Sequence, residues 1–309
     1  MTEEKHQFDV TIIGGGPAGI SAWLWCADVG LDAILLEKVA EFGGQLLSIH
    51  NPIRNYLGVD VINGRELRDR FARQIENIKM KRITAANVVA ADLVGRTLTL
   101  ADGTRFSGRA VVIATGVRRR KLGVPGEDRF HERGILRSGV TAKEQVASKT
   151  VVIVGGGDAA LENALLLAET AKKVVVVHRR NKFSARAEFV SAAENSKTIE
   201  FCFDSKITEI AGEAAVKSVH VKNLTLNTMA HLATDAVLIR IGVEPNTEMF
   251  RSQIDLDDTG YITIDARCAT SLPGIYAVGD VANSIAPTIA SAVGQGAIAA
   301  KAILKRLSL

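Results

Sequence analysis

The sequence has few cysteines, and no two of them are close enough in the chain to act as a local pair. Its 309 residues include three, Cys26, Cys202 and Cys268, which form neither a C-x-x-C motif nor a cluster of metal ligands. A sparse, odd set of thiols is typical of a reducing compartment, where cysteines are small buried side chains. We therefore expect no disulfide scaffold, no metal site and no cysteine nucleophile, and we assign no catalytic residue.

Aromatic residues and long apolar runs are also scarce. Aromatics make up 5% of the chain, and no basic segment is interleaved with them, so nucleic-acid binding is not expected despite a net charge of +4. No apolar run reaches transmembrane length, and the charged residues 1–6 lead directly into the first predicted strand without a signal peptide. With 47% hydrophobic residues, the sequence predicts a well-packed cytoplasmic protein with no membrane partner.

The first informative stretch is an apolar segment followed by a glycine-rich turn. Residues 10–13 predict a strand buried on both faces of a parallel sheet. Three glycines follow at the G-x-G-x-x-G spacing: Gly14, Gly16 and Gly19. They permit a sharp turn, close approach of a pyrophosphate and tight helix packing, and the helix from Pro17 directs its free N–H groups at the phosphates. A second strand, residues 33–36, ends at Glu37, whose carboxylate can accept both ribose hydroxyls, so this stretch predicts a dinucleotide site.

A second stretch repeats this pattern with one change of charge. The strand that begins at Thr150 is followed by a turn containing Gly155, Gly157 and Ala160. Its second strand, residues 174–177, ends in His178-Arg179-Arg180 instead of an acid. Guanidinium groups pair with a 2′-phosphate that a carboxylate would repel, so this site predicts NADPH rather than NADH. The alternative is a basic strand end that is simply solvated.

Between and after these motifs we expect short strands and three further helical features. The predicted helices are residues 64–78, 161–170 and a final one from Thr288 to Arg306. The predicted strands are residues 88–93, 97–101, 104–107, 207–210, 216–221, 236–241 and 261–265, a buried strand over residues 110–116 that ends in a glycine turn, and one that ends at Gly279-Asp280.

The order of these motifs resembles that of thioredoxin reductases of the low-molecular-weight type, over nearly the whole chain. The resemblance rests on Gly14–Gly19, Gly43–Leu46, Ala114–Gly116, Gly155–Asp158, His178–Arg180, Ile241–Asn246 and Ala277–Asp280. It implies an α/β fold with two Rossmann-like dinucleotide-binding domains, the second inserted in the first. The FAD domain would comprise residues 1–117 and 246–309, and the NADPH domain residues 118–245. It also implies a homodimer.

Carried over residue by residue, the resemblance implies two sets of cofactor contacts. For FAD they are Gly14, Gly16, Ala18, Gly19, Glu37, Gly44, Gln45, Leu46, Asn55, Val88, Ala114, Thr115, Gly116, Gly279, Asp280 and Thr288. For NADPH they are Gly155, Gly157, Asp158, Ala159, His178, Arg179, Arg180, Arg186, Ile241 and Gly242. Asp280 would bind the ribityl chain, and the helix from Thr288 would stabilise anionic reduced flavin with its dipole.

One departure from the family pattern decides the functional interpretation. Thioredoxin reductases place a C-x-x-C just before the second glycine turn, and this sequence has Ser138-Gly-Val-Thr141 there. Hydroxyls cannot form or attack a disulfide usefully, so we expect flavin electrons to leave directly. Ferredoxin– or flavodoxin–NADP reductases on this scaffold also lack the dithiol, and the basic run Arg118–Lys121 could receive such an acidic partner. However, their usual C-terminal extension is missing after the final helix. The alternatives are an NADPH oxidase or quinone reductase, and a flavin-bound redox sensor without turnover.

Overall fold

The computed structural model describes residues 5–308. The chain forms two compact units. The first comprises the residues up to Arg118 together with those from Glu244 onward, and the second comprises Arg119–Val243. The short strands β7 (Val117–Arg119) and β16 (Val243–Pro245) pair with each other where the chain passes between the units. The predicted α/β class with two Rossmann-type domains is confirmed.

The first unit contains a mixed sheet whose centre is the long strand β6. The strand order is β3-β2-β1-β6-β5-β4, and β17 pairs with the second half of β6. The strands are β1 (Lys5–Ile13), β2 (Ala33–Leu36), β3 (Arg82–Ile83), β4 (Val88–Asp92), β5 (Thr97–Leu100), β6 (Arg105–Ile113) and β17 (Ile275–Ala277). The two segments predicted at residues 104–107 and 110–116 therefore form one strand, which ends at Ile113. It continues through Gly108 because β1 pairs along its whole length.

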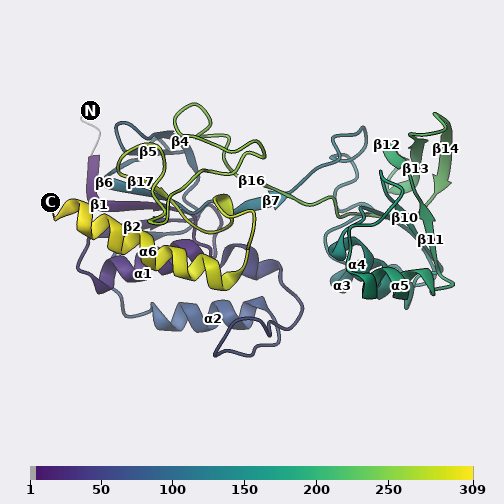
Figure 1. Ribbon diagram of the computed structural model, residues 1–309, viewed down its shortest axis with the longest axis horizontal. Helices are drawn as coiled ribbons and strands as arrows, with labels where there is room; N and C mark the ends of the chain where they lie inside the picture. Colours follow the sequence, from purple (N-terminus) through teal and green to yellow (C-terminus); the bar gives the residue numbers. More distant parts are fainter. Residues whose placement is uncertain (1–4, 309) are drawn as a thin grey trace. The chain divides into compact units, whose positions relative to one another are not determined.

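Helices pack on this sheet (Figure 1), and the beginning of the last helix lies at the cavity beside the first glycine turn. They are α1 (Pro17–Asp28), α2 (Gly64–Gln74) and α6 (Ile289–Leu307), with the 3-10 turns η1 (Gly44–Ser48) and η2 (Gly279–Val281). Helices α1 and α6 pack closely because Gly296 has no side chain; a Cβ there would lie 2.6 Å from the Ala18 carbonyl oxygen. Ser21 Oγ also donates to the Val293 carbonyl at 2.7 Å. The apolar faces of both helices and of β1 form one core.

The second unit has a parallel sheet and a small antiparallel sheet. The parallel order is β11-β10-β9-β15-β8, and the antiparallel order is β12-β13-β14. The strands are β8 (Ile135–Leu136), β9 (Thr150–Val154), β10 (Lys173–Val177), β11 (Ile199–Cys202), β12 (Ser205–Gly212), β13 (Val216–Asn223), β14 (Met229–Ala233) and β15 (Ala236–Ile239). The helices are α3 (Gly139–Ala142), α4 (Asp158–Ala168) and α5 (Ala187–Glu194). No helix within residues 5–308 is long and apolar enough to cross a membrane.

Two predicted elements differ most from the structure. The strand expected at residues 261–265 is a loop in which only Ile262 forms an isolated bridge, to Leu256. Its N–H groups bond to Val281, Asp255 and Ala269 in turn, so no single neighbouring strand can pair with it. Helix α2 ends at Gln74 rather than Ile78, because Ile75 caps it by bonding to the carbonyls of Phe71 and Arg73.

Candidate functional site

A cavity of about 620 Å³ lies in the first unit at the carboxyl ends of β1, β2 and β6, within the usual volume range for small-molecule sites. The cavity is lined by these residues that the sequence predicted: Gly14, Gly16, Ala18, Glu37, Gly44, Gln45, Leu46, Val88, Ala114, Thr115, Gly116, Gly279, Asp280 and Thr288. Asn55 does not line it; it lies in the exposed loop after Ile53. Gly19 does not line it either, because it packs beneath the turn.

The first glycine turn is built so that a side chain would block it. Gly14 has a φ of +104°, and a Cβ there would lie 2.3 Å from the Ala114 carbonyl oxygen. A Cβ at Gly19 would lie 1.8 Å from the Gly14 carbonyl oxygen, so Gly19 allows α1 to begin directly against the turn. A Cβ at Gly16 would meet only Gly44 Cα, at 3.9 Å, and Gly16 lines the cavity. These are the three roles that the spacing predicts for a phosphate-binding turn.

Glu37 holds this turn from the end of β2. One carboxylate oxygen accepts from the Gly15 N–H at 2.6 Å, and the other accepts from the Val39 N–H at 2.9 Å. The residue is only 8% exposed and lines the cavity. Each oxygen of a carboxylate has a second lone pair, so Glu37 can hold the loop and still accept ribose hydroxyls.

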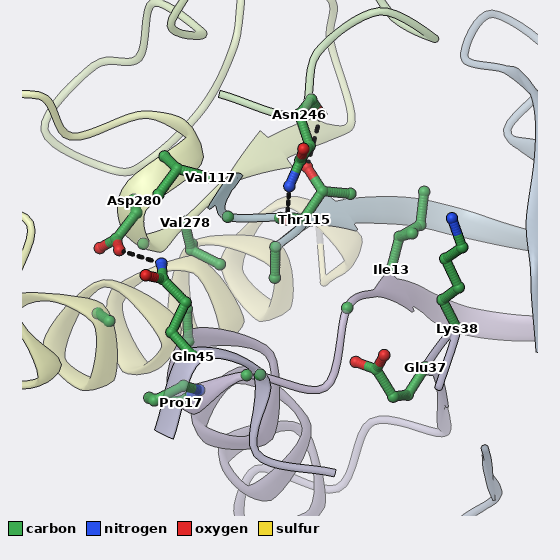
Figure 2. Close-up of a pocket in the computed structure, with 18 of the residues that line it drawn as sticks. Ile13, Pro17, Glu37, Lys38, Gln45, Thr115, Val117, Asn246, Val278 and Asp280 are labelled. Carbon is green, nitrogen blue, oxygen red and sulfur yellow. Dashed lines mark hydrogen bonds between the residues drawn. The ribbon is translucent and has the colours of Figure 1, made fainter. Parts of the chain in front are cut away.

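The Asp280–Gln45 pair lies at another part of the same cavity. Gln45 Nε2 donates to Asp280 Oδ2 at 2.9 Å, and burial raises the pKa of the Asp280 carboxyl group above its usual value (Figure 2). Thr288 caps the nearby N-terminus of α6, where its Oγ1 accepts from the Ser291 N–H at 3.2 Å. The cavity therefore combines a glycine turn, an acid at the end of the second strand, a second carboxylate and a positive helix end, which together fit FAD.

Some cavity residues were missed by the sequence analysis. They are Ile13, Pro17, Leu36, Lys38, Val39, Ile49, Ala86, Asn87, Val117, Arg118, Asn246, Glu248, Met249, Phe250, Val278, Pro287, Ile289 and Ala292. Asn246 lies there because its side-chain amide donates to the Thr115 carbonyl at 2.8 Å, while Thr115 Oγ1 donates to the Asn246 carbonyl at 2.9 Å (Figure 2). In the sequence, the only indication of this contact was that Asn246 ends the Ile241–Asn246 motif.

The second glycine turn repeats the first with a histidine in place of the glutamate. Gly155 has a φ of +146°, and a Cβ there would lie 2.1 Å from the Arg240 carbonyl oxygen. A Cβ at Gly156 would lie 2.3 Å from the His178 ring. That ring is 8% exposed, stacks on Phe183 at a centroid distance of 5.5 Å, and has Nε2 3.1 Å from the Lys182 carbonyl oxygen. Burial lowers the pKa of His178, so this residue supports the turn as a neutral ring.

The charged residues around this second turn point to an anionic ligand. Arg179 and Arg180 are exposed at the end of β10, where a 2′-phosphate would lie. Asp158 begins α4 and is held by Arg186, whose backbone N–H and Nε donate to its two oxygens at 2.7 and 2.9 Å. Ala159 is exposed on the first turn of α4, and Ile241 and Gly242 follow β15. This donor set fits an NADP-type dinucleotide better than NAD.

The basic run at residues 118–121 carries less free charge than its sequence indicates. Arg118 pairs with Glu244 at 2.7 Å and also with Glu248, and Lys121 pairs with Asp128 at 2.6 Å. Arg120 Nε donates to the Val243 carbonyl oxygen at 2.8 Å. Much of the run therefore stabilises the chain near β7 and β16.

The three thiols and the two hydroxyls lie in separate elements, and Cys202 is only partly buried, whereas buried thiols were expected. Ser138 is the N-cap of α3, and Thr141 lies within that short helix. Cys26 and Cys268 are buried in the core of the first unit, where burial raises the pKa of their thiols to about 12 and about 11. Cys202 lies on β11 in the second unit. All three are free cysteines.

Two units that each carry a glycine turn at the carboxyl ends of parallel strands define a protein that binds two dinucleotides. The chain belongs to the pyridine nucleotide-disulphide oxidoreductase family, which matches residues 8–296. It is an FAD-dependent oxidoreductase of the thioredoxin reductase type, and that family uses FAD and NADPH.

Relatives and solved structures agree with this assignment. The chain is 34% identical to a thioredoxin reductase of Streptomyces coelicolor, over 94% of this chain and 91% of the relative. It is 30% identical to a 34.2 kDa protein in the rubredoxin operon of Clostridium pasteurianum, over 97% of both. The crystal structure of Lactococcus lactis thioredoxin reductase in its FR conformation matches with a TM-score of 0.85 and 32% identity, over 98% of this chain and all of that one.

Proposed function

We propose that this protein oxidises NADPH and passes the electrons from FAD directly to an external acceptor, without an internal dithiol. FAD would be bound in the cavity of the first unit and NADPH at the glycine turn of the second. When bound, FAD can accept a hydride and release two electrons one at a time. The chain's own residues would orient the two dinucleotides and hold their charges.

The observation that carries this proposal is the state of the thiols. Ser138 and Thr141 stand where the family pattern has two cysteines. Burial holds the Cys26 and Cys268 thiols protonated, and the thiolate is the form that exchanges with disulfides. Burial also raises the pKa of Cys202, which lies in the other unit. None of the three is therefore suited to carry electrons.

For the acceptor we favour an acidic one-electron carrier of the ferredoxin or flavodoxin kind. The relative in a rubredoxin operon supports a protein carrier, because its gene lies with that of another redox protein. A small acceptor such as a quinone is the second candidate. It is favoured by the ion pairs of Arg118 and Lys121, which leave less free charge for an acidic protein.

The proposal is tested with the purified protein saturated with FAD. Anaerobic addition of NADPH should reduce the flavin, and reoxidation is then measured with ferredoxin, flavodoxin, a quinone, oxygen and oxidised thioredoxin in parallel. Fast reoxidation by a carrier that has no disulfide supports the proposal. Catalytic reduction of thioredoxin contradicts it, and failure of NADPH to reduce the flavin supports a redox sensor instead.

A further inference from the structure

Beside its glycine turn, the second unit has two arginines, Arg119 and Arg240, that form no ion pair with the described residues. Neither the motifs nor the proposed function requires them. The strand order β11-β10-β9-β15-β8 reverses direction between β9 and β15. Dinucleotides cross a parallel sheet at such a reversal, outside the carboxyl ends of its strands. With the 2′-phosphate at the end of β10 and the turn at the end of β9, the nicotinamide half extends over the end of β15.

Arg240 is the residue that follows β15 at this edge. Its backbone is packed against the turn: its N–H donates to the Val154 carbonyl at 2.7 Å, and its own carbonyl excludes any side chain at Gly155. Its half-buried guanidinium donates only to neutral carbonyls, those of Ile239 at 2.8 Å and Arg137 at 3.1 Å. No carboxylate in the described chain pairs with it.

A second guanidinium adds to this uncompensated charge. Burial, together with repulsion from Arg119, lowers the pKa of Arg240 to about 10, so it remains charged at neutral pH. The Arg120 N–H donates to the Gly242 carbonyl at 3.1 Å, which places Arg119 next to the segment that follows β15. The Arg119 side chain has neither an ion pair nor a hydrogen bond among the described residues, and partial burial lowers its pKa as well. Two neighbouring cations that are partly desolvated and lack an acid are costly unless an anion binds between them.

The glycine turn also needs such cations for a pyrophosphate. The acid that begins α4, Asp158, is negatively charged at the helix end where phosphates bind, and Arg186 is occupied in holding it. Arg179 and Arg180 lie at the end of β10, on the adenosine side. The backbone N–H groups of the turn are therefore left without a nearby free cation on the nicotinamide side, unless Arg240 and Arg119 supply it.

We propose that Arg240 and Arg119 form an anion subsite that binds the nicotinamide-side phosphate of NADPH. This deepens the proposed function, since it rests on NADPH binding in the second unit. It divides recognition into two parts: Arg179 and Arg180 select the 2′-phosphate, whereas Arg240 and Arg119 hold the other half of the dinucleotide.

The test compares NADP⁺ with adenosine 2′,5′-bisphosphate, which lacks the nicotinamide-side phosphate, by calorimetric titration of the FAD-bound protein. Arg240→Gln and Arg119→Gln should each weaken NADP⁺ binding roughly tenfold, as expected for a lost charged hydrogen bond, and leave the bisphosphate within twofold. Arg240→Lys should recover part of the NADP⁺ affinity. Arg137→Gln is the matched control, because Arg137 lies at the same edge but is paired with Glu132 at 2.5 Å, and should change neither ligand.

Each other outcome overturns the subsite. Unchanged NADP⁺ binding in a folded Arg240→Gln protein, or equal weakening of both ligands, would show that Arg240 does not contact that phosphate. An effect only on the KM for an acidic acceptor would assign the two arginines to partner docking. A failure of the proposed function would give a different result. The affinities for NADP⁺ and for the bisphosphate would stay as expected, but the carriers would not be reduced.

Discussion

The two glycine turns of this protein share a backbone but differ in the side chain that supports them. In the first unit, Glu37 accepts from the Gly15 N–H at 2.6 Å, and in the second the His178 ring lies in the same place against Gly156. Glu37 can also accept hydrogen bonds from ribose hydroxyls. The neutral His178 ring has no charge to offer a nucleotide, so recognition of a 2′-phosphate would depend on Arg179 and Arg180. The side chains at the end of the second strand thus differ between the two turns, and this difference predicts different dinucleotides for the two sites.

The largest effect is expected from a substitution that disrupts the backbone conformation that the two turns share. Gly155→Ala places a Cβ 2.1 Å from the Arg240 carbonyl at a φ of +146°, so we expect a loss of about 3–5 kcal/mol in the free energy of unfolding. Gly157→Ala is the matched control, because its nearest neighbour is Ser184 Oγ at 3.8 Å. It should fold normally in denaturant titrations and lose NADP⁺ affinity. Equal stability of the two variants would contradict the role given to Gly155.

The next change removes a polar group from the cavity of the first unit. Asp280→Ala should weaken FAD retention by about 1.5–3 kcal/mol, the usual contribution of a charged hydrogen bond. Asp265→Ala is the control, since that acid caps a loop outside the cavity. FAD content after gel filtration, measured by absorbance, checks this, and full retention of FAD by Asp280→Ala would mean that the carboxylate does not contact the cofactor.

Arg179→Ala/Arg180→Ala should reduce the preference for NADPH over NADH by a similar amount, about tenfold to a hundredfold in affinity. The physical reason is the loss of charge opposite the 2′-phosphate. Anaerobic flavin reduction over a range of concentrations of both nucleotides measures the preference. If wild type and variant use NADH and NADPH equally well, the arginines are only solvated surface residues.

The smallest expected effect concerns pH and separates the two supporting side chains. Burial places the pKa of His178 below its usual value of about 6.5, so the unfolded chain binds a proton that the folded chain does not. His178 therefore destabilises the fold as pH falls below about 6.5 and has no such effect above it. Thermal unfolding at pH 8 and pH 5.5 should show a smaller loss of stability in His178→Gln than in wild type. An identical loss in both would exclude His178 as the cause.

The local parts of the fold and site were accessible from sequence. Both glycine turns, the strands before them and the charges after the second strands lie within about 30 residues of each other in each unit, so their spacing alone predicts them. Asn87, Met249 and Phe250 were not predicted as cavity residues, because tertiary packing brings their loops there without a local motif. The same reason explains the wrong strand at residues 261–265: the segment has the alternation of a strand, but its backbone N–H groups bond to three separate segments.

The central claim, that no internal dithiol carries electrons, is tested most directly by titrating thiols in the protein. Unfolded samples are compared before and after anaerobic reduction with NADPH, so that buried cysteines are counted in both. The account predicts three titratable thiols in each sample and unchanged acceptor turnover when Cys26, Cys202 and Cys268 are all replaced by alanine. A single titratable thiol before reduction and three after it would mean that a remote cysteine pair carries the electrons, and would contradict the account.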